Sequence, residues 1–188
     1  MYGLVNKAIE EMVCTHFDRA TWERIQVRSG LDGDPFLAMQ QYPDHVTYQL
    51  VDSASDTLHL DHATILREFG RYWMLYTSNE GYGELIKLTG ESFREFLQNL
   101  DMLHARVGLS YPELRPPSFQ CVDAADGSLH LHYYSDRAGL APMVSGLIEG
   151  LAERFAMRVS VDLIASRDQG DDHEIFRIVA DTGTQHHD

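Results

Sequence analysis

One histidine lies inside the apolar face of a predicted helix. Between Glu91 and Leu109, apolar residues recur every three or four positions, and His104 falls within this stripe (Phe93, Phe96, Leu97, Leu100, Leu103, Val107). A buried imidazole needs partners for its ring nitrogens, because an unpaired buried polar group is costly. A metal ion is one such partner. On position alone, a core histidine held by hydrogen bonds is the simpler interpretation.

Three polar residues at alternate positions form a second candidate site. Tyr133, Ser135 and Arg137 follow an alternating run that contains Leu129 and Leu131, so all five side chains would share one face of a strand. Such a strand would end in two hydroxyls and a guanidinium, a group suited to bidentate binding of a carboxylate. The pattern indicates a ligand that is apolar at one end and anionic at the other. An ordinary strand end with a solvated arginine is the alternative.

The remaining reactive residue types show no catalytic or structural pattern. Cys14 and Cys121 are far apart and lack metal-ligand spacing, which argues against a disulfide framework and against structural zinc. His130 and His132 alternate on the face opposite Leu129, where solvent exposure explains them. We therefore expect no enzymatic activity and no catalytic residue.

The first half of the chain reads as helices separated by turns. An apolar helical pattern runs from Tyr2 to Ile25 and is interrupted at Gly30 and Gly33. After a linker with two prolines, Asp44 and Asp61 are candidate N-caps of two further helices, the second of which ends in a turn at residues 79–84.

Beta structure is predicted only after the proline-rich segment 110–119. The pair Asp126-Gly127 predicts a hairpin turn before a strand at 128–134, a helix follows at 140–155, and strands at 157–165 and 173–180 flank the loop 167–172. The predicted fold class is α+β: a helical N-terminal half packed on a C-terminal half with a small antiparallel sheet and inserted helices. We expect one domain over residues 1–182 and a frayed tail at 183–188.

Composition narrows the possible partners. The chain has 188 residues, is 44% hydrophobic and carries a net charge of −14, which disfavours nucleic acid and anionic membranes as partners. No apolar run approaches the roughly 20 residues of a membrane span, and the N-terminus does not read as a signal peptide. We therefore expect a cytoplasmic protein without membrane insertion.

Together these residues resemble the heme nitric oxide/oxygen binding (H-NOX) domains, which are related to the heme domain of soluble guanylate cyclase. The resemblance covers nearly all of the chain, and the nearest likeness is to bacterial stand-alone members of cyanobacterial type. It rests on the segments MYGLVNKAIEEMV, FGRYWMLYTSNEGYGELI, NLDMLHARVGLSYPELRPPSF and YYSDRAGLAPMVSGLIEGLAERF.

The resemblance implies a bound heme b, that is iron protoporphyrin IX, between the two halves. His104 corresponds to the histidine that binds the iron, and Pro117 to the proline that bends the porphyrin. The Y-x-S-x-R motif of the family, whose side chains hold the heme propionates, matches Tyr133, Ser135 and Arg137. Residues of the distal gas pocket correspond by the same comparison to Val5, Ile9, Trp73, Met143 and Leu147.

The resemblance also implies which gas binds. In oxygen-binding members a tyrosine donates a hydrogen bond to dioxygen, and the matching position here is Met143, which cannot donate. We therefore expect binding of nitric oxide and carbon monoxide, with dioxygen excluded. An oxygen carrier or oxygen sensor of the same fold is the alternative, should Tyr2, Tyr72 or Trp73 supply a donor.

In the family, nitric oxide weakens the bond between iron and histidine. The resemblance implies that release of His104 then shifts the two halves of the domain and relays the signal to a separate partner, such as a histidine kinase or a cyclic-di-nucleotide enzyme.

Overall fold

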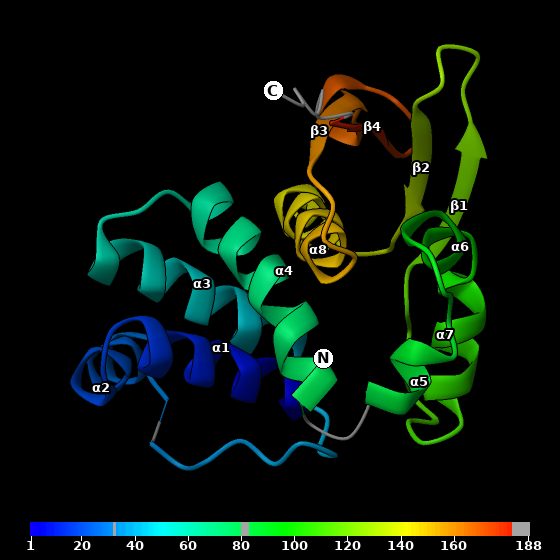
Figure 1. Cartoon of the computed structure of the whole chain (residues 1–188). Helices are drawn as coiled ribbons and strands as arrows, with labels where there is room; N and C mark the ends of the chain where they lie inside the picture. The colour runs from blue at the N-terminus through cyan, green and yellow to red at the C-terminus, as the bar shows by residue number, and fades with distance from the viewer. Residues whose placement is uncertain (32, 80–82, 182–188) are drawn as a thin grey trace, which may run out of the picture.

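The computed structural model describes residues 1–31, 33–79 and 83–181, and it places a helical first half beside a second half built on a small sheet (Figure 1). The first half contains α1 (Gly3–His16), α2 (Arg19–Arg28), α3 (Asp44–Leu58) and α4 (His62–Asn79). The second half contains α5 (Gly83–Lys87), α6 (Phe93–Gln98), α7 (Leu100–Gly108), β1 (Ser118–Asp123), β2 (Leu129–Tyr134), α8 (Ala141–Arg154), β3 (Val159–Ala165), a 3-10 turn η1 (Arg167–Gln169) and β4 (Glu174–Ala180). The predicted α+β class is confirmed.

The sheet has four strands in the order β1-β2-β4-β3, and every neighbouring pair is antiparallel. The predicted hairpin turn lies between β1 and β2, where Gly127 has a φ of 83° and the Asp126 carboxylate accepts a hydrogen bond from the Ser128 amide at 3.0 Å. The sheet therefore begins one strand earlier than the alternating run at 128–134 suggested, because a hairpin needs β1 as its first arm.

Each half has its own apolar core. Trp22, Ile25 and Leu50 are completely buried within the helices of the first half. In the second half, Leu131 and Phe176 from the sheet pack into a single cluster with side chains from α6 and α8. The two cores meet where α4 lies against α8.

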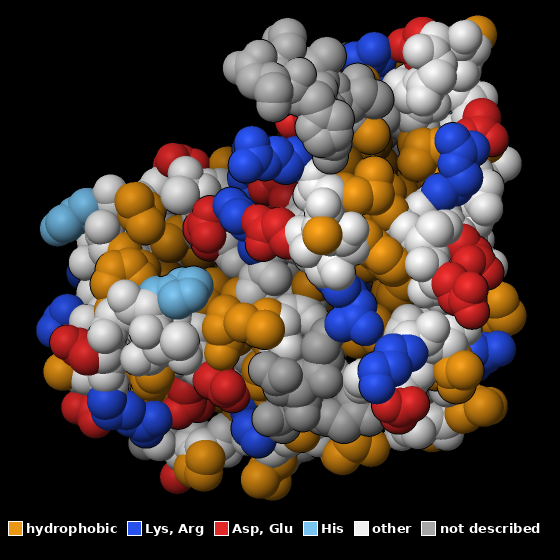
Figure 2. All heavy atoms as spheres, viewed as in Figure 1, with side chains coloured by type: hydrophobic (Ala, Val, Ile, Leu, Met, Phe, Trp, Pro, Cys, Tyr) orange, Lys and Arg blue, Asp and Glu red, His pale blue; other side chains and the backbone are white. Residues whose placement is uncertain are grey.

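Helices α4 and α8 approach so closely that only glycine fits at their crossing. A Cβ atom added to Gly70 would lie 2.1 Å from the carbonyl oxygen of Met143, and one added to Gly146 would lie 1.9 Å from that of Arg67. Ion pairs flank this contact, joining Arg67 to Glu149 and Arg71 to Glu153. Figure 2 shows acidic and basic side chains next to one another over the seam between the two helices. The crossing is the main direct packing contact between the halves.

The predicted helix from Glu91 to Leu109 is wrong in one respect, because the structure divides it at Asn99. This residue has φ −100° and ψ 8°, and its side-chain Nδ2 donates to the carbonyl oxygen of Thr89 at 2.8 Å. Apolar spacing continues across the break, so periodicity alone could not reveal it. The division separates α7, which carries His104, from α6.

One N-terminal prediction is also corrected. The helical pattern from Tyr2 to Ile25 forms α1 and α2, in keeping with the two helices expected before Asp44, and Asp18 caps α2 by accepting a hydrogen bond from the Thr21 amide at 2.7 Å. Asp44 is the first residue of α3 and not its N-cap, a position held by Pro43. The predicted cap at Asp61 is confirmed, since its carboxylate accepts from the Thr64 amide at 2.9 Å.

Two expectations fall on residues outside the described part of the chain. The turn at 79–84 includes residues 80–82, and the frayed tail at 183–188 lies beyond residue 181. Among the described residues, no helix combines the length and apolar character needed to cross a membrane.

Candidate functional site

A cavity of about 830 Å³ lies between the two halves. This volume is within the range of roughly 300–1,000 Å³ that is usual for ligand pockets. All ten residues predicted for the site line it: Val5, Ile9, Trp73, His104, Pro117, Tyr133, Ser135, Arg137, Met143 and Leu147. The walls come from α1, α3 and α4 of the first half and from α6, α7, β2 and α8 of the second half, so the fold brings together residues distant in sequence.

His104 enters this cavity from α7. Its Nδ1 atom is buried and makes no hydrogen bond of normal geometry with any described residue. Burial lowers the pKa of His104, while the charge of Asp101 and the nearby backbone of Pro117 act in the opposite direction. The lowered pKa favours the neutral imidazole, which is the form that binds a metal ion.

Asp101 ties the helix of His104 to the strand that follows Pro117. Its two carboxylate oxygens accept hydrogen bonds from the amide of Phe119 at 2.7 Å and from the hydroxyl of Ser118 at 2.8 Å. The Phe119 ring in turn lies between His104 and Tyr133, with centroid distances of 5.8 Å and 5.3 Å. Asp101 therefore links α7 directly to the start of β1.

The polar end of the cavity is formed by Tyr133, Ser135 and Arg137, but not in the way a single strand predicts. Only Tyr133 lies on β2, where it shares the buried face with Leu129 and Leu131. Since β2 ends at Tyr134, Ser135 and Arg137 belong to the following loop, which is the correction to the strand interpretation. Burial raises the pKa of Tyr133, and the neighbouring Ser135 hydroxyl acts in the opposite direction.

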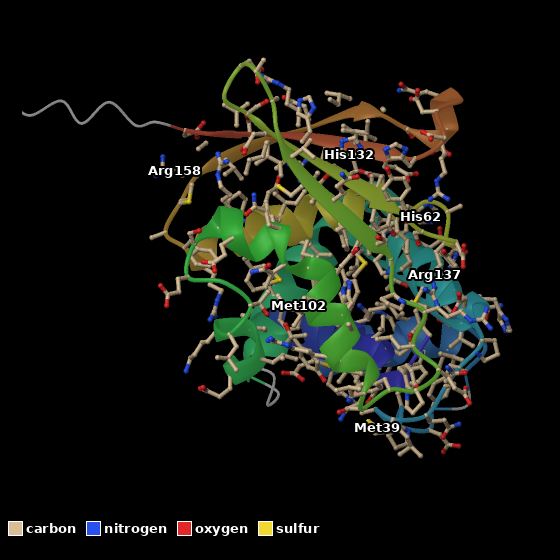
Figure 3. All side chains as sticks on the ribbon, turned by 90° about the vertical axis from the view of Figure 1, so that its right-hand side faces the viewer. Met39, His62, Met102, His132, Arg137 and Arg158 are labelled. Carbon is tan, nitrogen blue, oxygen red and sulfur yellow. The ribbon has the colours of Figure 1, made fainter. Side chains whose placement is uncertain are left out.

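Arg137 makes a contact between the halves. Its Nε donates to the Asp44 carboxylate at 2.9 Å, and its Nη1 donates to the carbonyl oxygen of Arg115 at 2.9 Å. The N-terminal ammonium of Met1 donates to the same Asp44 carboxylate at 2.6 Å. Figure 3 shows Arg137 beside the first half of the chain, whereas His132 lies on the sheet.

Two opposing effects set the pKa of Asp44. Burial acts to raise it, but the hydrogen bonds from the N-terminal ammonium and Arg137 outweigh burial, and the pKa lies below its ordinary value. Asp44 is therefore ionised at neutral pH and holds both cations beside the polar end of the cavity.

The wall opposite His104 is apolar apart from a few groups. Val5 and Ile9 come from α1, Trp73 from α4, and Met143 and Leu147 from α8, which lie across the cavity from α7 (Figure 1). The two threonines in this part of the lining already donate elsewhere: Thr47 to Asn6 at 2.7 Å, and Thr77 to the carbonyl oxygen of its own helix at residue 73 at 2.8 Å.

The proposed alternative donors differ in position. Tyr2 lines the cavity, and its hydroxyl oxygen accepts from the Glu113 amide at 3.3 Å. Tyr72 does not line it and packs edge-on against His16 instead. The Trp73 indole lines the cavity and has no hydrogen-bond partner among the described residues.

Several polar residues at the site were not found from the sequence. Tyr48 donates its hydroxyl to the carbonyl oxygen of Ala138 at 3.0 Å, and Arg167 contacts the same loop from the opposite side. Tyr48 lies one helical turn after Asp44, so an i, i+4 pair of polar residues on α3 was the only available signal.

The histidine interpretation needs one change. His132 is half-buried, and its Nδ1 lies 2.8 Å from Nε2 of His173, so exposure alone does not describe it. In the described part of the chain, no group of three or more His, Cys, Asp or Glu side chains is arranged to hold a metal ion. Burial raises the pKa of the Cys121 thiol to about 11, which leaves it unreactive at neutral pH.

The residues fit the heme that the resemblance implies. A heme needs one axial ligand, an apolar slot and cationic or hydroxyl groups for its carboxylates. The cavity offers a single histidine with an unpaired buried nitrogen, an apolar opposite wall, and Ser135 and Arg137 at one end. A porphyrin supplies four nitrogens itself, so a lone protein ligand suffices.

Comparison with known proteins agrees with this geometry. Residues 2–163 match the family described as Haem-NO-binding. The soluble guanylate cyclase gcy-32 of Caenorhabditis elegans is 32% identical over 157 residues, covering 82% of this chain and 23% of its own length. The beta-2 subunit of the soluble guanylate cyclase of Rattus norvegicus is 44% identical over 91 residues, covering 48% of this chain and 13% of its own length. The chain thus spans about a quarter or less of these relatives.

A solved structure shows the same fold. The crystal structure of an H-NOX protein from S. oneidensis in the Fe(II)NO ligation state superposes with a TM-score of 0.87 at 18% sequence identity. The match covers 96% of this chain and 99% of that protein.

Proposed function

The chain belongs to the Haem-NO-binding family of heme-based gas-sensing domains, and from this premise we propose that it binds heme b and senses nitric oxide. His104 is the proposed iron ligand, and the domain is proposed to comprise residues 1–182. Carbon monoxide is proposed as a second ligand and dioxygen as an excluded one. The observation that carries the proposal is the single cavity in which His104 and the motif residues meet.

When bound, heme supplies the ferrous iron to which a diatomic gas attaches. The chain supplies the rest. Neutral His104 would hold the iron from α7, and Tyr133, Ser135 and Arg137 would bind the two propionates. Pro117 lines the same cavity near His104 and would press on the porphyrin.

Selectivity is proposed to follow from the apolar wall. Bound dioxygen is polarised and gains from a hydrogen-bond donor, whereas nitric oxide and carbon monoxide bind ferrous heme without one. Met143 cannot donate, and the hydroxyl hydrogens of Thr47 and Thr77 are committed to other acceptors. An oxygen-binding protein of the same fold is the second candidate, favoured by one observation: the Trp73 indole lines the cavity.

Signalling is proposed to depend on two contacts. Release of His104 would free α7 to move, and Asp101 would carry that movement to β1 through Phe119. Arg137 would couple the same change to Asp44 in the first half. The proposed recipient is a signalling protein such as a histidine kinase or a cyclic-di-nucleotide enzyme, and we assign the chain itself sensing and no catalysis.

One series of absorption spectra tests the proposal. Protein purified with heme, reduced without oxygen, should change its Soret band on addition of nitric oxide or carbon monoxide and remain unchanged in air-saturated buffer before slow oxidation. A protein without a Soret band would exclude the heme proposal. A stable, reversible spectral change with dioxygen would instead support the second candidate.

A further inference from the structure

The loop that carries Ser135 and Arg137 has no backbone support of its own. Residues 135–139 form no backbone-to-backbone hydrogen bond with the described residues. Where the chain leaves a sheet, its backbone carbonyl groups need hydrogen-bond donors from elsewhere, because unpaired polar groups are costly when they are shielded from water. Side chains from other elements provide these donors.

Arg167 supplies two of them with one side chain. Its Nη1 donates to the carbonyl oxygen of Ser135 at 2.7 Å, and its Nη2 donates to that of Arg137 at 2.9 Å. These are the two loop residues of the motif. The Arg167 guanidinium thus binds the backbone of the two loop residues whose side chains line the cavity.

Glu174 holds this guanidinium in place. The Arg167 Nε donates to both carboxylate oxygens of Glu174, at 2.9 Å and 3.1 Å. The Glu174 side chain is only 6% exposed, and it stands at the start of β4 opposite Tyr133 of β2. A buried carboxylate is expensive unless it is paired, and Arg167 supplies the pairing charge.

The turn that presents Arg167 is itself ordered. Ser166 caps η1 by accepting from the Asp168 amide at 3.2 Å, and the Ser166 amide donates to the Asp171 carboxylate at 2.8 Å. Arg167 therefore reaches the loop from a rigid position on the sheet side. On the other side, Tyr48 and Asp44 of α3 contact Ala138 and Arg137.

We propose that Arg167 and Glu174 are positioning residues that fix the Ser135–Arg137 loop to the sheet. The Ser135 hydroxyl and the Arg137 guanidinium are then oriented before an anionic ligand group arrives. This inference rests on the proposed function, because the anionic group is a heme propionate. It follows that the loop moves with the sheet and that relative motion of the halves occurs at the contacts of Asp44 and Tyr48.

Substitution of Arg167 by lysine tests the role of its guanidinium group. Lysine keeps the charge for Glu174 but cannot span three separated acceptors, so at least one loop carbonyl loses its donor. In R167K we expect heme transfer to an excess of a heme-scavenging globin to be about tenfold faster, as for the loss of one charge-assisted hydrogen bond. E174Q keeps both loop contacts and should give a smaller increase.

Two signatures separate positioning from general stability. Resonance Raman bands of the propionates should shift in R167K, whereas the iron–histidine stretch should stay at its wild-type frequency, because His104 lies on α7. In the heme-free protein, exchange of the Arg137 amide, which donates to the Ser135 hydroxyl at 3.1 Å, should accelerate. The matched control is R177K. Arg177 lies on β4, away from the cavity, and its Nε and Nη2 donate to the Asp126 carboxylate at 3.2 Å and 2.8 Å.

The outcomes are distinct. If wild-type protein binds no heme, the proposed function fails, while the amide exchange still tests the loop. If wild-type protein binds heme, and R167K and E174Q show wild-type heme transfer, propionate bands and amide exchange, the positioning role is refuted. Changes in R167K that R177K reproduces equally would also refute it.

Discussion

At the scale of single residues, the proposed site depends on one imidazole, that of His104. The Nδ1 atom of His104 is buried and unpaired among the described residues, a condition that costs stability in the heme-free protein. In metal sites, the imidazole nitrogen that does not bind the metal usually donates to a backbone carbonyl or a carboxylate. With iron held by the other ring nitrogen, the Pro117 backbone beside His104 would take this role.

Replacing His104 by glycine should abolish heme retention. The cavity would keep its shape and its polar end, so added imidazole should occupy the space of the lost ring and restore a Soret band. Absorbance titration with imidazole measures this. The control is His132→Gly, which removes a histidine from the sheet outside the cavity lining and should leave heme content unchanged. Normal heme content in H104G without imidazole would show that the ligand assignment is wrong.

Selectivity among gases is a second property of single side chains. Met143→Tyr should place a hydroxyl donor on the wall opposite His104, and a donor stabilises polarised dioxygen by roughly 1–3 kcal/mol, which is about 5- to 150-fold in affinity. Oxygen titration of the ferrous protein measures the gain. Met143→Phe has a similar size and no hydroxyl, so it should bind oxygen no better than wild type. Equal gains in both variants would show that space, not hydrogen bonding, controls selectivity.

At the scale of elements, sequence periodicity located nearly every helix and strand but not the breaks within them. The apolar stripe of residues 91–109 continues through Asn99, where a side-chain contact with Thr89 interrupts the helix. Such a contact depends on a residue ten positions away and has no periodic signature. The short helix α5 and the strand β1 likewise had no pattern strong enough to define them.

The same limit applies to the site. Every residue assigned from the motif lines the cavity, because a motif preserves positions that face a common ligand. The residues that support the motif were missed. Arg167 and Glu174 are seven positions apart across a turn, and Asp44 was interpreted as a helix cap although its carboxylate pairs with Arg137. The contacts of Arg167 and Glu174 form only once the sheet is assembled, and that of Asp44 only once the two halves are packed together.

The crossing of α4 and α8 yields a prediction about these two elements. Gly146→Ala would place a methyl group 1.9 Å from the Arg67 carbonyl oxygen, a contact between two helix backbones that cannot relax locally. We expect a loss of about 2–4 kcal/mol in the free energy of unfolding. Denaturant titration of the heme-free protein measures it.

A second glycine provides the comparison for that experiment. Gly108, at the end of α7, has nothing within 4 Å of an added Cβ. Gly108→Ala should therefore leave stability unchanged or raise it by up to about 1 kcal/mol. A neutral G146A would mean that α4 and α8 can separate without cost, and the helices would then not be a fixed contact between the halves.

At the scale of the whole molecule, Asp44 links three distant parts of the chain. It binds the N-terminal ammonium of Met1 at 2.6 Å and Arg137 at 2.9 Å, so one carboxylate connects the start of α1, the start of α3 and the motif loop. The first two belong to the first half and the third to the second. The charge of Asp44 should therefore contribute to the cohesion of the halves.

The pKa of Asp44 is lowered in the folded protein, which fixes the sign of its pH dependence. A carboxylate with a lowered pKa stabilises the fold above its unfolded pKa, near 4, and this contribution disappears as the pH falls through the folded value. Asp44→Asn should thus destabilise the heme-free protein by about 1 kcal/mol at pH 7, a modest figure because the Asp44 side chain is 40% exposed. Below the folded pKa of Asp44 the two proteins should be equally stable.

Unfolding midpoints of wild type and D44N between pH 2.5 and pH 8 measure this difference. The control is Asp56→Asn, because Asp56 pairs with Arg28 wholly within the first half and is more exposed. If cohesion between the halves is what Asp44 provides, D44N should also broaden the denaturant transition, since the halves then unfold less cooperatively, whereas D56N should not. A difference between wild type and D44N that stays constant down to pH 2.5 would show that the ionised carboxylate is not its source, and the coupling of Arg137 to the first half would then have to arise from packing alone.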